Sequence, residues 1–209
     1  MNTGDYIAEI NRQLADHTVY KSVNFDPKFD IARRIKLLVD DAYASDLIDV
    51  KLHDFLIKQH PVTPVSYTFR KIHKNLLKPP GHPIVSGIDS ILAPLAIFLD
   101  RVLKPLAAST PSFIQDTTDF ILKLESLSLS TGDLLVSFDV CSLYTSIAHI
   151  KGIEATTNYL RGTSLNSDQQ EFVLSLLDVV LTCNYFMFLD RLYIQKRGTA
   201  MGANMAPSY

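Results

Sequence analysis

The sequence predicts an α+β protein, because helix-type and strand-type patterns both recur along it. Apolar residues at helical spacing follow Pro27 and indicate a helix that faces a core. Two strand-like runs, 65–72 and 83–86, surround a proline-rich turn. A further strand pair is predicted within 185–195. We therefore expect helices and strands together in an α+β fold.

Composition sets limits on the class of protein. The chain has 209 residues, 47% of them hydrophobic and 20% charged, with a net charge of −2 and a pI near 6.3. This excludes intrinsic disorder and a uniformly basic nucleic-acid coat. Two cysteines exclude a disulfide framework. The apolar run 91–99 is far short of the roughly 18 residues of a membrane span. With no signal peptide, we expect a nuclear or cytoplasmic protein without a membrane.

The chain divides into two predicted regions. Residues 1–60 are expected to be mainly helical and carry no pattern that points to chemistry. Residues 61–209 hold every candidate site. The last residues follow a glycine turn without a helix stop signal, which predicts that the chain is a fragment.

A basic, acid-free stretch lies between Phe55 and Ile88. Its cations are Lys58, Arg70, Lys71, Lys74 and Lys78. A basic hairpin is suited to binding a triphosphate or a nucleic-acid backbone. The alternative is a solvated charged hairpin without a ligand.

Three helices are predicted in the middle of the chain. The first covers 88–108, and the second covers 116–127 with Phe120, Ile121 and Leu124 facing inward. The third begins at a capping box of Ser167 and Gln170 and continues to about residue 183.

Asp139 is the sharpest candidate for chemistry. The run from Leu134 to Val140 is otherwise mainly apolar and predicts a buried strand that has the Asp139 carboxylate at or near its end. A carboxylate on a rigid strand end is what a two-metal phosphoryl-transfer site requires. The alternative is an aspartate that caps the next turn.

A glycine turn forms the third candidate. Gly198 and Gly202 flank small residues before a predicted helix, which permits another backbone to approach closely. A phosphate-binding P-loop is excluded, because no Lys-Ser/Thr pair follows the second glycine. The alternative is a tight turn of structural use only.

Together these stretches resemble the reverse transcriptases of Penelope-like retroelements, a branch related to telomerase. The matching pieces are KIHKNLLKPPGHPIVSGIDSILAPLAIFLD, DLLVSFDVCSLYTSIAHIKGIEA and LTCNYFMFLDRLYIQKRGTAMGANMAPSY. They occur in the family's order and cover most of 65–209. The resemblance implies fingers over 61–110 and a partial palm over 111–209, the palm being an antiparallel sheet backed by helices.

The resemblance also implies roles for individual residues. In the fingers, Lys71 or, by preference, Lys74 is expected to contact the incoming nucleotide's triphosphate, with His82 nearby. Asp139 is expected to bind both Mg²⁺ ions, with the Val140 carbonyl as a further ligand.

The remaining roles concern sugar selection and base-pair packing. Tyr144 stands at the position of the steric gate against the ribose 2′-hydroxyl. Met201 and Gly202 are expected to pack on the template and the nascent base pair.

Departures from the family pattern qualify these roles. His82 replaces the usual arginine, and Arg70 replaces a proline. The paired-aspartate motif of the palm is absent, and one carboxylate is too few for a two-metal centre. We therefore expect a chain that descends from an RNA-directed DNA polymerase and is itself inactive. Its expected partners are an RNA template, a DNA primer and a deoxynucleoside triphosphate. The alternative is a non-catalytic relic that binds nucleic acid.

Overall fold

The computed structural model describes residues 2–76, 79–128 and 130–209, so Lys78 of the predicted basic hairpin lies outside the described residues. The predicted α+β class is confirmed. The elements in chain order are α1 (Thr3–Leu14), β1 (Tyr20–Val23), α2 (Lys28–Ala44), α3 (Val50–Leu56), β2 (Val65–Arg70), β3 (Gly81–Ser86), α4 (Ala93–Ala108), α5 (Thr117–Glu125), α6 (Leu143–Ser146), α7 (His149–Leu160), α8 (Ser167–Thr182), β4 (Tyr185–Phe188) and β5 (Arg191–Gln195).

One mixed sheet organises the strands, in the order β1-β5-β4-β2-β3. The hairpins β2–β3 and β4–β5 are antiparallel, as predicted, but β2 pairs in parallel with β4 through Val65 and Met187. The sheet is therefore mixed, whereas the family resemblance implied an antiparallel palm sheet. Strand β1 was not predicted, and it pairs with β5 although it belongs to the N-terminal region.

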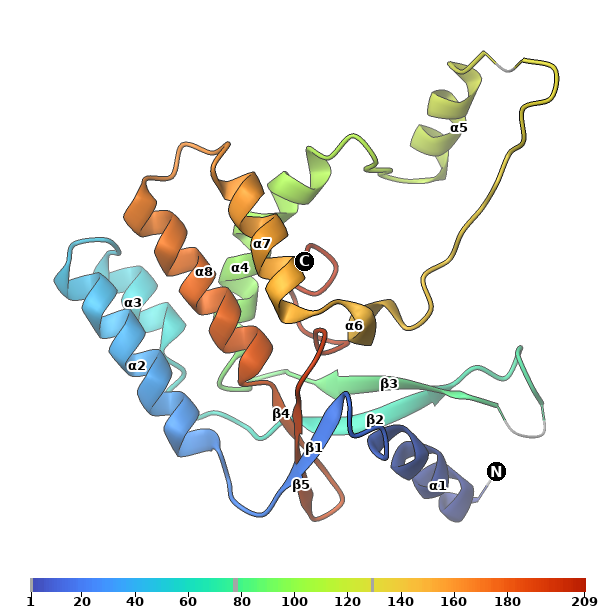
Figure 1. Cartoon of the computed structure of the whole chain (residues 1–209). Coiled ribbons are helices and arrows are strands. Elements are labelled where there is room, and N and C mark those ends of the chain that lie inside the picture. The colour runs from blue at the N-terminus through green and yellow to red at the C-terminus, as the bar shows by residue number, and fades with distance from the viewer. Residues whose placement is uncertain (1, 77–78, 129) are drawn as a thin grey trace.

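Five helices cover one face of this sheet. In Figure 1, α2, α3, α4, α7 and α8 form a layer above and beside the strands. Their buried residues make one core, in which Leu95, Leu99 and Leu176 are fully buried. Helix α2 contributes Ile31, Ile35 and other residues of the face that its periodicity predicts. None of the described helices has both the length and the apolarity needed to cross a bilayer.

Helix α1 covers the opposite face of the sheet. Its Ile10 and Leu14 pack in a second core with Val85 and Phe186. The neighbouring strand residue Tyr185 belongs to the first core. This division follows from the alternation of side chains along a strand, and it places the sheet between two apolar layers.

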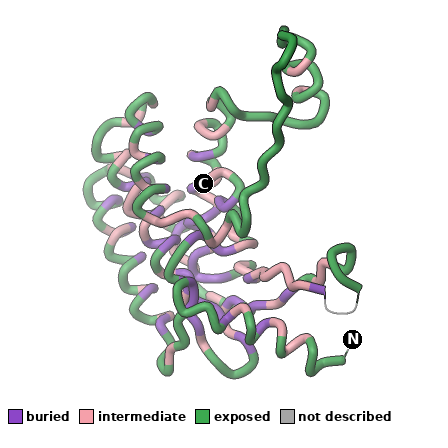
Figure 2. The backbone as a smooth tube through the Cα atoms, turned by 45° about the vertical axis from the view of Figure 1, so that its right-hand side comes forward, coloured by how far each residue is buried: buried purple, intermediate pink, exposed green. Residues whose placement is uncertain are grey.

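An extended excursion leaves this body between α4 and α6. We call residues 111–140 the arm, which Figure 2 shows as an almost wholly exposed projection. Asp116 caps α5, since its side chain accepts a hydrogen bond from Asp119 N. The predicted inward face of α5 (Phe120, Ile121, Leu124) is wrong, because no residue of α5 is buried.

The strand predicted over 134–140 is also absent. This stretch has no regular structure, and Leu134 and Phe138 are 86% and 91% exposed. An apolar run forms a buried strand only where another strand completes its hydrogen bonds, and no described strand lies against this one. Asp139 therefore lies on an exposed segment and not at the end of a buried strand.

Three helix boundaries differ from the predictions. The helix expected over 88–108 begins at Ala93, because the left-handed Asp89 (φ 55°) ends the preceding turn. The capping box of α8 uses Asn166 and Gln169, one residue earlier than predicted. Gly202 is followed by turns and not by a helix.

Candidate nucleic-acid interface

The β2–β3 hairpin carries the predicted basic group. Its register pairs Thr68 with Pro83 and Arg70 with Gly81, and one further bond joins Lys71 N to Pro80 O. Lys74 lies in the following turn, where its amide donates to Lys71 O. Lys71 and Lys74 therefore lie just beyond the end of the regular β2–β3 ladder.

The cations of this stretch differ in their interaction partners. Lys58 pairs with Asp89 at 2.6 Å. Arg70 donates to Asp5 O at 2.6 Å and to Pro79 O at 3.3 Å, so it stabilises the backbone. Among residues 2–76, 79–128 and 130–209, no acid pairs with Lys71 or Lys74. These two lysines are the hairpin cations best placed to take an external anion.

His82 is half-buried on β3, near this lysine pair. Burial, and then the positive charge of Lys71, lower the pKa of His82 below its usual 6.5. The imidazole is therefore neutral at pH 7, and it offers a phosphate one hydrogen-bond donor in place of the charged fork of an arginine.

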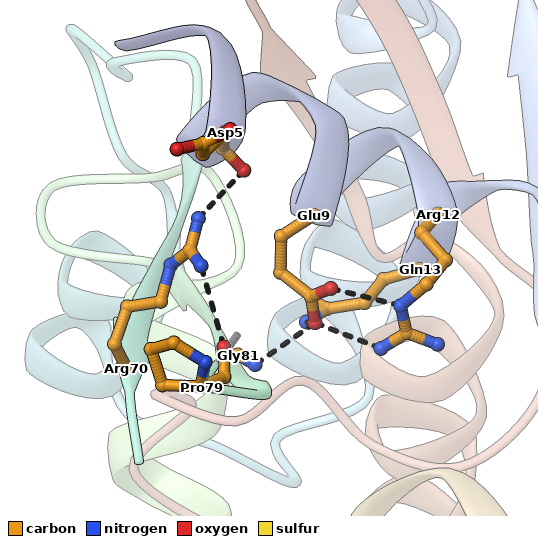
Figure 3. A network of polar contacts seen from close by, with 7 residues as sticks. All are labelled: Asp5, Glu9, Arg12, Gln13, Arg70, Pro79 and Gly81. Carbon is orange, nitrogen blue, oxygen red and sulfur yellow. Dashed lines mark hydrogen bonds and ion pairs between the residues drawn. The ribbon is translucent and has the colours of Figure 1, made fainter. Parts of the chain in front are cut away.

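Helix α1 anchors the hairpin through Glu9, as Figure 3 shows. The Glu9 carboxylate accepts hydrogen bonds from Gly81 N at 2.8 Å, from Gln13 Nε2 at 2.9 Å and from Arg12 at 2.7 Å. The bond from Arg12, followed by those from Gly81 and Gln13, outweighs burial and lowers the pKa of Glu9 to about 2. A Cβ on Gly81 would collide with Thr68 Oγ1 and Gln13 Nε2, so a larger residue here would displace these side chains.

Two further bonds complete the anchor. Thr68 N donates to Tyr6 Oη at 3.1 Å, and Arg70 reaches the backbone of Asp5. The hairpin is thus held at several points by one face of α1. Sequence reasoning missed this role; the only local signal was the placement of Tyr6, Glu9 and Gln13 on adjacent turns of one helix.

Three segments that are far apart in sequence meet beside the hairpin. We call the junction the place where β3, α6 and the turn 197–202 come together. Val85 N donates to Met201 O at 2.9 Å, and Thr199 N donates to Tyr144 O at 2.7 Å. His149 Nε2 donates to Gly198 O at 2.8 Å. The junction therefore brings together Tyr144, Met201 and Gly202 of the predicted site with the strand that carries His82.

The two glycines make this close approach possible. Gly198 (φ 74°) and Gly202 (φ 116°) both adopt left-handed backbone. A Cβ on Gly198 would collide with the backbone of Tyr144, and one on Gly202 would collide with Val85 O. The backbone that approaches these glycines belongs to the chain itself, which agrees with the alternative of a structural turn, and the packing of Gly202 on a template base pair stays a prediction.

Buried amides hold the turn from behind. Gln195 Nε2 donates to Arg197 O at 2.8 Å and to Thr199 O at 3.1 Å. Asn184 Nδ2 donates to Gln195 Oε1 at 3.0 Å. Sequence reasoning missed both residues, although two amides at the ends of an apolar hairpin were a visible signal.

The cavities at the junction are small. One of about 30 Å³ borders Val85 and Gly202, and another of about 20 Å³ borders Tyr144 and Met201. Each has room for a water molecule and not for a nucleotide. A nucleic-acid ligand would therefore have to lie on the open surface of the hairpin and the junction.

Asp139 and Val140 are not brought into this group. Both are exposed on the arm, and among the described residues no cluster of three or more His, Cys, Asp or Glu is arranged to hold a metal ion. A single carboxylate on an exposed segment does not fit the requirements of two Mg²⁺ ions. Magnesium binding at Asp139 stays a prediction.

Comparisons with protein-family models, with curated proteins and with solved structures give no match to this chain.

The Glu9 anchor predicts a pH-dependent stability. Replacing Glu9 by Gln should lower the free energy of unfolding at pH 7 by about 1–3 kcal/mol, because hydrogen bonds to a charged group are lost. Since the folded pKa lies near 2 and the ordinary value is 4.5, the carboxylate's contribution is complete above pH 4.5 and is lost as the pH falls toward 2. Urea unfolding at pH 7 and pH 3 should show the difference shrinking.

Glu154→Gln is the matched control, since Glu154 makes one exposed ion pair with Lys151. Its effect should stay below about 0.5 kcal/mol. Equal effects of the two substitutions at pH 7 would contradict the anchoring role of Glu9.

The junction predicts that Gly202→Ala destabilises the chain by about 1–3 kcal/mol, because alanine is strained at this φ and its Cβ meets Val85 O. Thermal unfolding measures this. Gly162→Ala is the control, because a Cβ there meets Tyr159 O at an ordinary 3.5 Å. If both variants unfold at the wild-type temperature, the turn is not held against β3.

Proposed function

We propose that this chain is related to the fingers and palm of the reverse transcriptases of Penelope-like elements, and that it holds nucleic acid on its hairpin and junction. The observation that carries the proposal is the meeting of β3, α6 and the turn 197–202. Each of these segments belongs to one of the three stretches that carry the resemblance.

The electrostatics of the hairpin support the same function. Lys71 and Lys74 project from the hairpin whose strand β3 also forms the junction. Lys71 and Lys74 follow Arg70 at the tip of the hairpin, whereas Val85 lies opposite Ser66 near its other end, so a nucleic-acid backbone that binds these lysines would have to extend along β3 to reach Tyr144 and Met201. The ligand classes proposed are an RNA template with a DNA primer, and a deoxynucleoside triphosphate.

Binding is better supported than catalysis for the chain as given. The binding residues sit on anchored elements, whereas Asp139 sits on the exposed arm. Nucleotidyl transfer needs several carboxylates held at fixed positions around a metal pair. We therefore propose descent from an RNA-directed DNA polymerase, with nucleic-acid binding as the retained activity.

The binding role is tested by the double variant Lys71→Ala/Lys74→Ala. Loss of two phosphate contacts should weaken binding to a primer–template duplex and reduce the slope of log K against log salt by about 1.4–1.8. Fluorescence anisotropy at several salt concentrations measures both quantities.

Lys36→Ala/Lys151→Ala removes the same charge from lysines that pair with acids on helices of the body. This control should keep the wild-type slope. If the hairpin variant and the control bind alike, the hairpin is a solvated surface and the proposed interface is wrong.

Primer extension tests the distinction between binding and catalysis. With Mg²⁺, an RNA template, a DNA primer and all four deoxynucleotides, the purified chain should give no extended product, because Asp139 lacks a second fixed carboxylate among the described residues. Template-dependent synthesis that disappears in Asp139→Ala would show that the chain is an active polymerase.

A further inference from the structure

The arm exposes an unusual amount of apolar surface. Its most exposed large apolar side chains are Leu122, Leu127, Leu134, Leu135, Val136 and Phe138. Contiguous apolar surface of this kind marks an interaction site in a folded protein. Figures 1 and 2 show that the arm stands away from the body along most of its length.

The helix of the arm also needs a partner for its stability. Helix α5 has nine residues and buries none of them. Isolated helices shorter than about 12–15 residues are marginal in water, and most helical stability comes from packing of an apolar face. The Asp116 cap and the Lys123–Asp119 pair support α5 only locally.

Charge indicates what covers the arm. By sequence the arm has five acids and one base: Asp116, Asp119, Glu125, Asp133, Asp139 and Lys123. An acidic and apolar surface is complemented by a basic and apolar one.

The chain itself carries such a surface on the β2–β3 hairpin. Lys71 and Lys74 have no acidic partner among the described residues, and Phe69, Ile72 and Leu76 beside them are exposed. The hairpin stretch from Phe55 to Ile88 contains no acid at all. The arm and the hairpin are thus complementary in charge, and both present apolar side chains.

We propose that the arm of one copy docks on the β2–β3 hairpin of a second copy, in a two-fold dimer with two equivalent arm–hairpin contacts. Figures 1 and 2 both show the arm and the hairpin tip as separate projections on one side of the body, with no contact between them. In this dimer, the arm of each copy contacts the hairpin of the other copy. Such self-complementary pairing is the commonest form of oligomer.

The dimer does not depend on the proposed function. Nucleic acid is proposed to bind the same lysines, so it would compete with the arm of the second copy. Only this competition rests on the proposed function. The oligomeric state without nucleic acid tests the dimer separately.

The test uses charge exchange in the full-length chain. Variant A carries Lys71→Glu and Lys74→Glu, which replace two hairpin cations without an acidic partner among the described residues by acids. Variant B carries Glu125→Lys and Asp139→Lys, two arm acids whose side chains make no hydrogen bond or ion pair with described residues, so the net charge of its arm rises from −4 to 0. Sedimentation equilibrium measures the dimer dissociation constant of A, of B and of their equimolar mixture.

We expect the wild-type chain to dimerise, with weaker association at higher salt. A and B alone should dimerise about tenfold or more weakly, because the attraction between the hairpin lysines and the arm acids is lost at both contacts. The mixture should associate more tightly than A or B alone, since one contact then joins the unchanged arm of A to the unchanged hairpin of B, and the other pairs the introduced acids with the introduced lysines. Circular dichroism of A and B confirms that both remain folded.

The mixture also separates this dimer from closure of the arm on its own hairpin. In a self-closed chain the contact is intramolecular, so mixing A with B restores nothing. A wild-type chain that stays monomeric at every concentration, a dimer unaffected by both charge reversals, or a mixture no tighter than A or B alone would overturn the proposal. A monomeric result would indicate that a different protein covers the arm.

Discussion

The candidate interface depends on the close backbone contact between the turn 197–202 and its two neighbours, β3 and α6. Val85 N donates to Met201 O, and Thr199 N donates to Tyr144 O. These bonds are possible because Gly198 and Gly202 have no Cβ that would hold the segments apart. Gln195 fixes the turn from the interior by binding two of its carbonyl oxygens. Without this contact, β3, α6 and the turn 197–202 would be separate elements.

A second constraint aligns the hairpin with that junction. Glu9 of α1 accepts the Gly81 amide, and its neighbours on the helix bind Thr68 and Arg70. These bonds leave Lys71 and Lys74 as the hairpin's cations without an acidic partner among the described residues. The result is a basic group at the tip of the hairpin whose strand β3 forms the junction, and the same molecule carries an acidic and apolar arm.

The sequence predicted the elements whose determinants are local. The hairpin 65–86 was recognisable from its prolines and glycines, and α2 from the periodic spacing of Ile31 and Ile35. The strand at 134–140 was wrongly predicted, because an apolar run indicates what a segment would bury and not whether a partner is available. The Glu9–Gly81 bond links residues 72 positions apart, so no local pattern revealed it. The bond between Tyr144 and Thr199 likewise joins distant segments, so no spacing in the chain revealed it.

Hydrogen–deuterium exchange of the intact chain, followed by mass spectrometry at a concentration too low for self-association, tests the junction most directly. Our account predicts that peptides covering β3 and the turn 197–202 exchange slowly, because the amides of Val85 and Thr199 are hydrogen-bonded to Met201 and Tyr144. Peptides from 134–140 should exchange fast and serve as the internal reference for unprotected backbone. If the turn 197–202 exchanges as fast as 134–140, the three segments do not form one site and the proposed interface is contradicted.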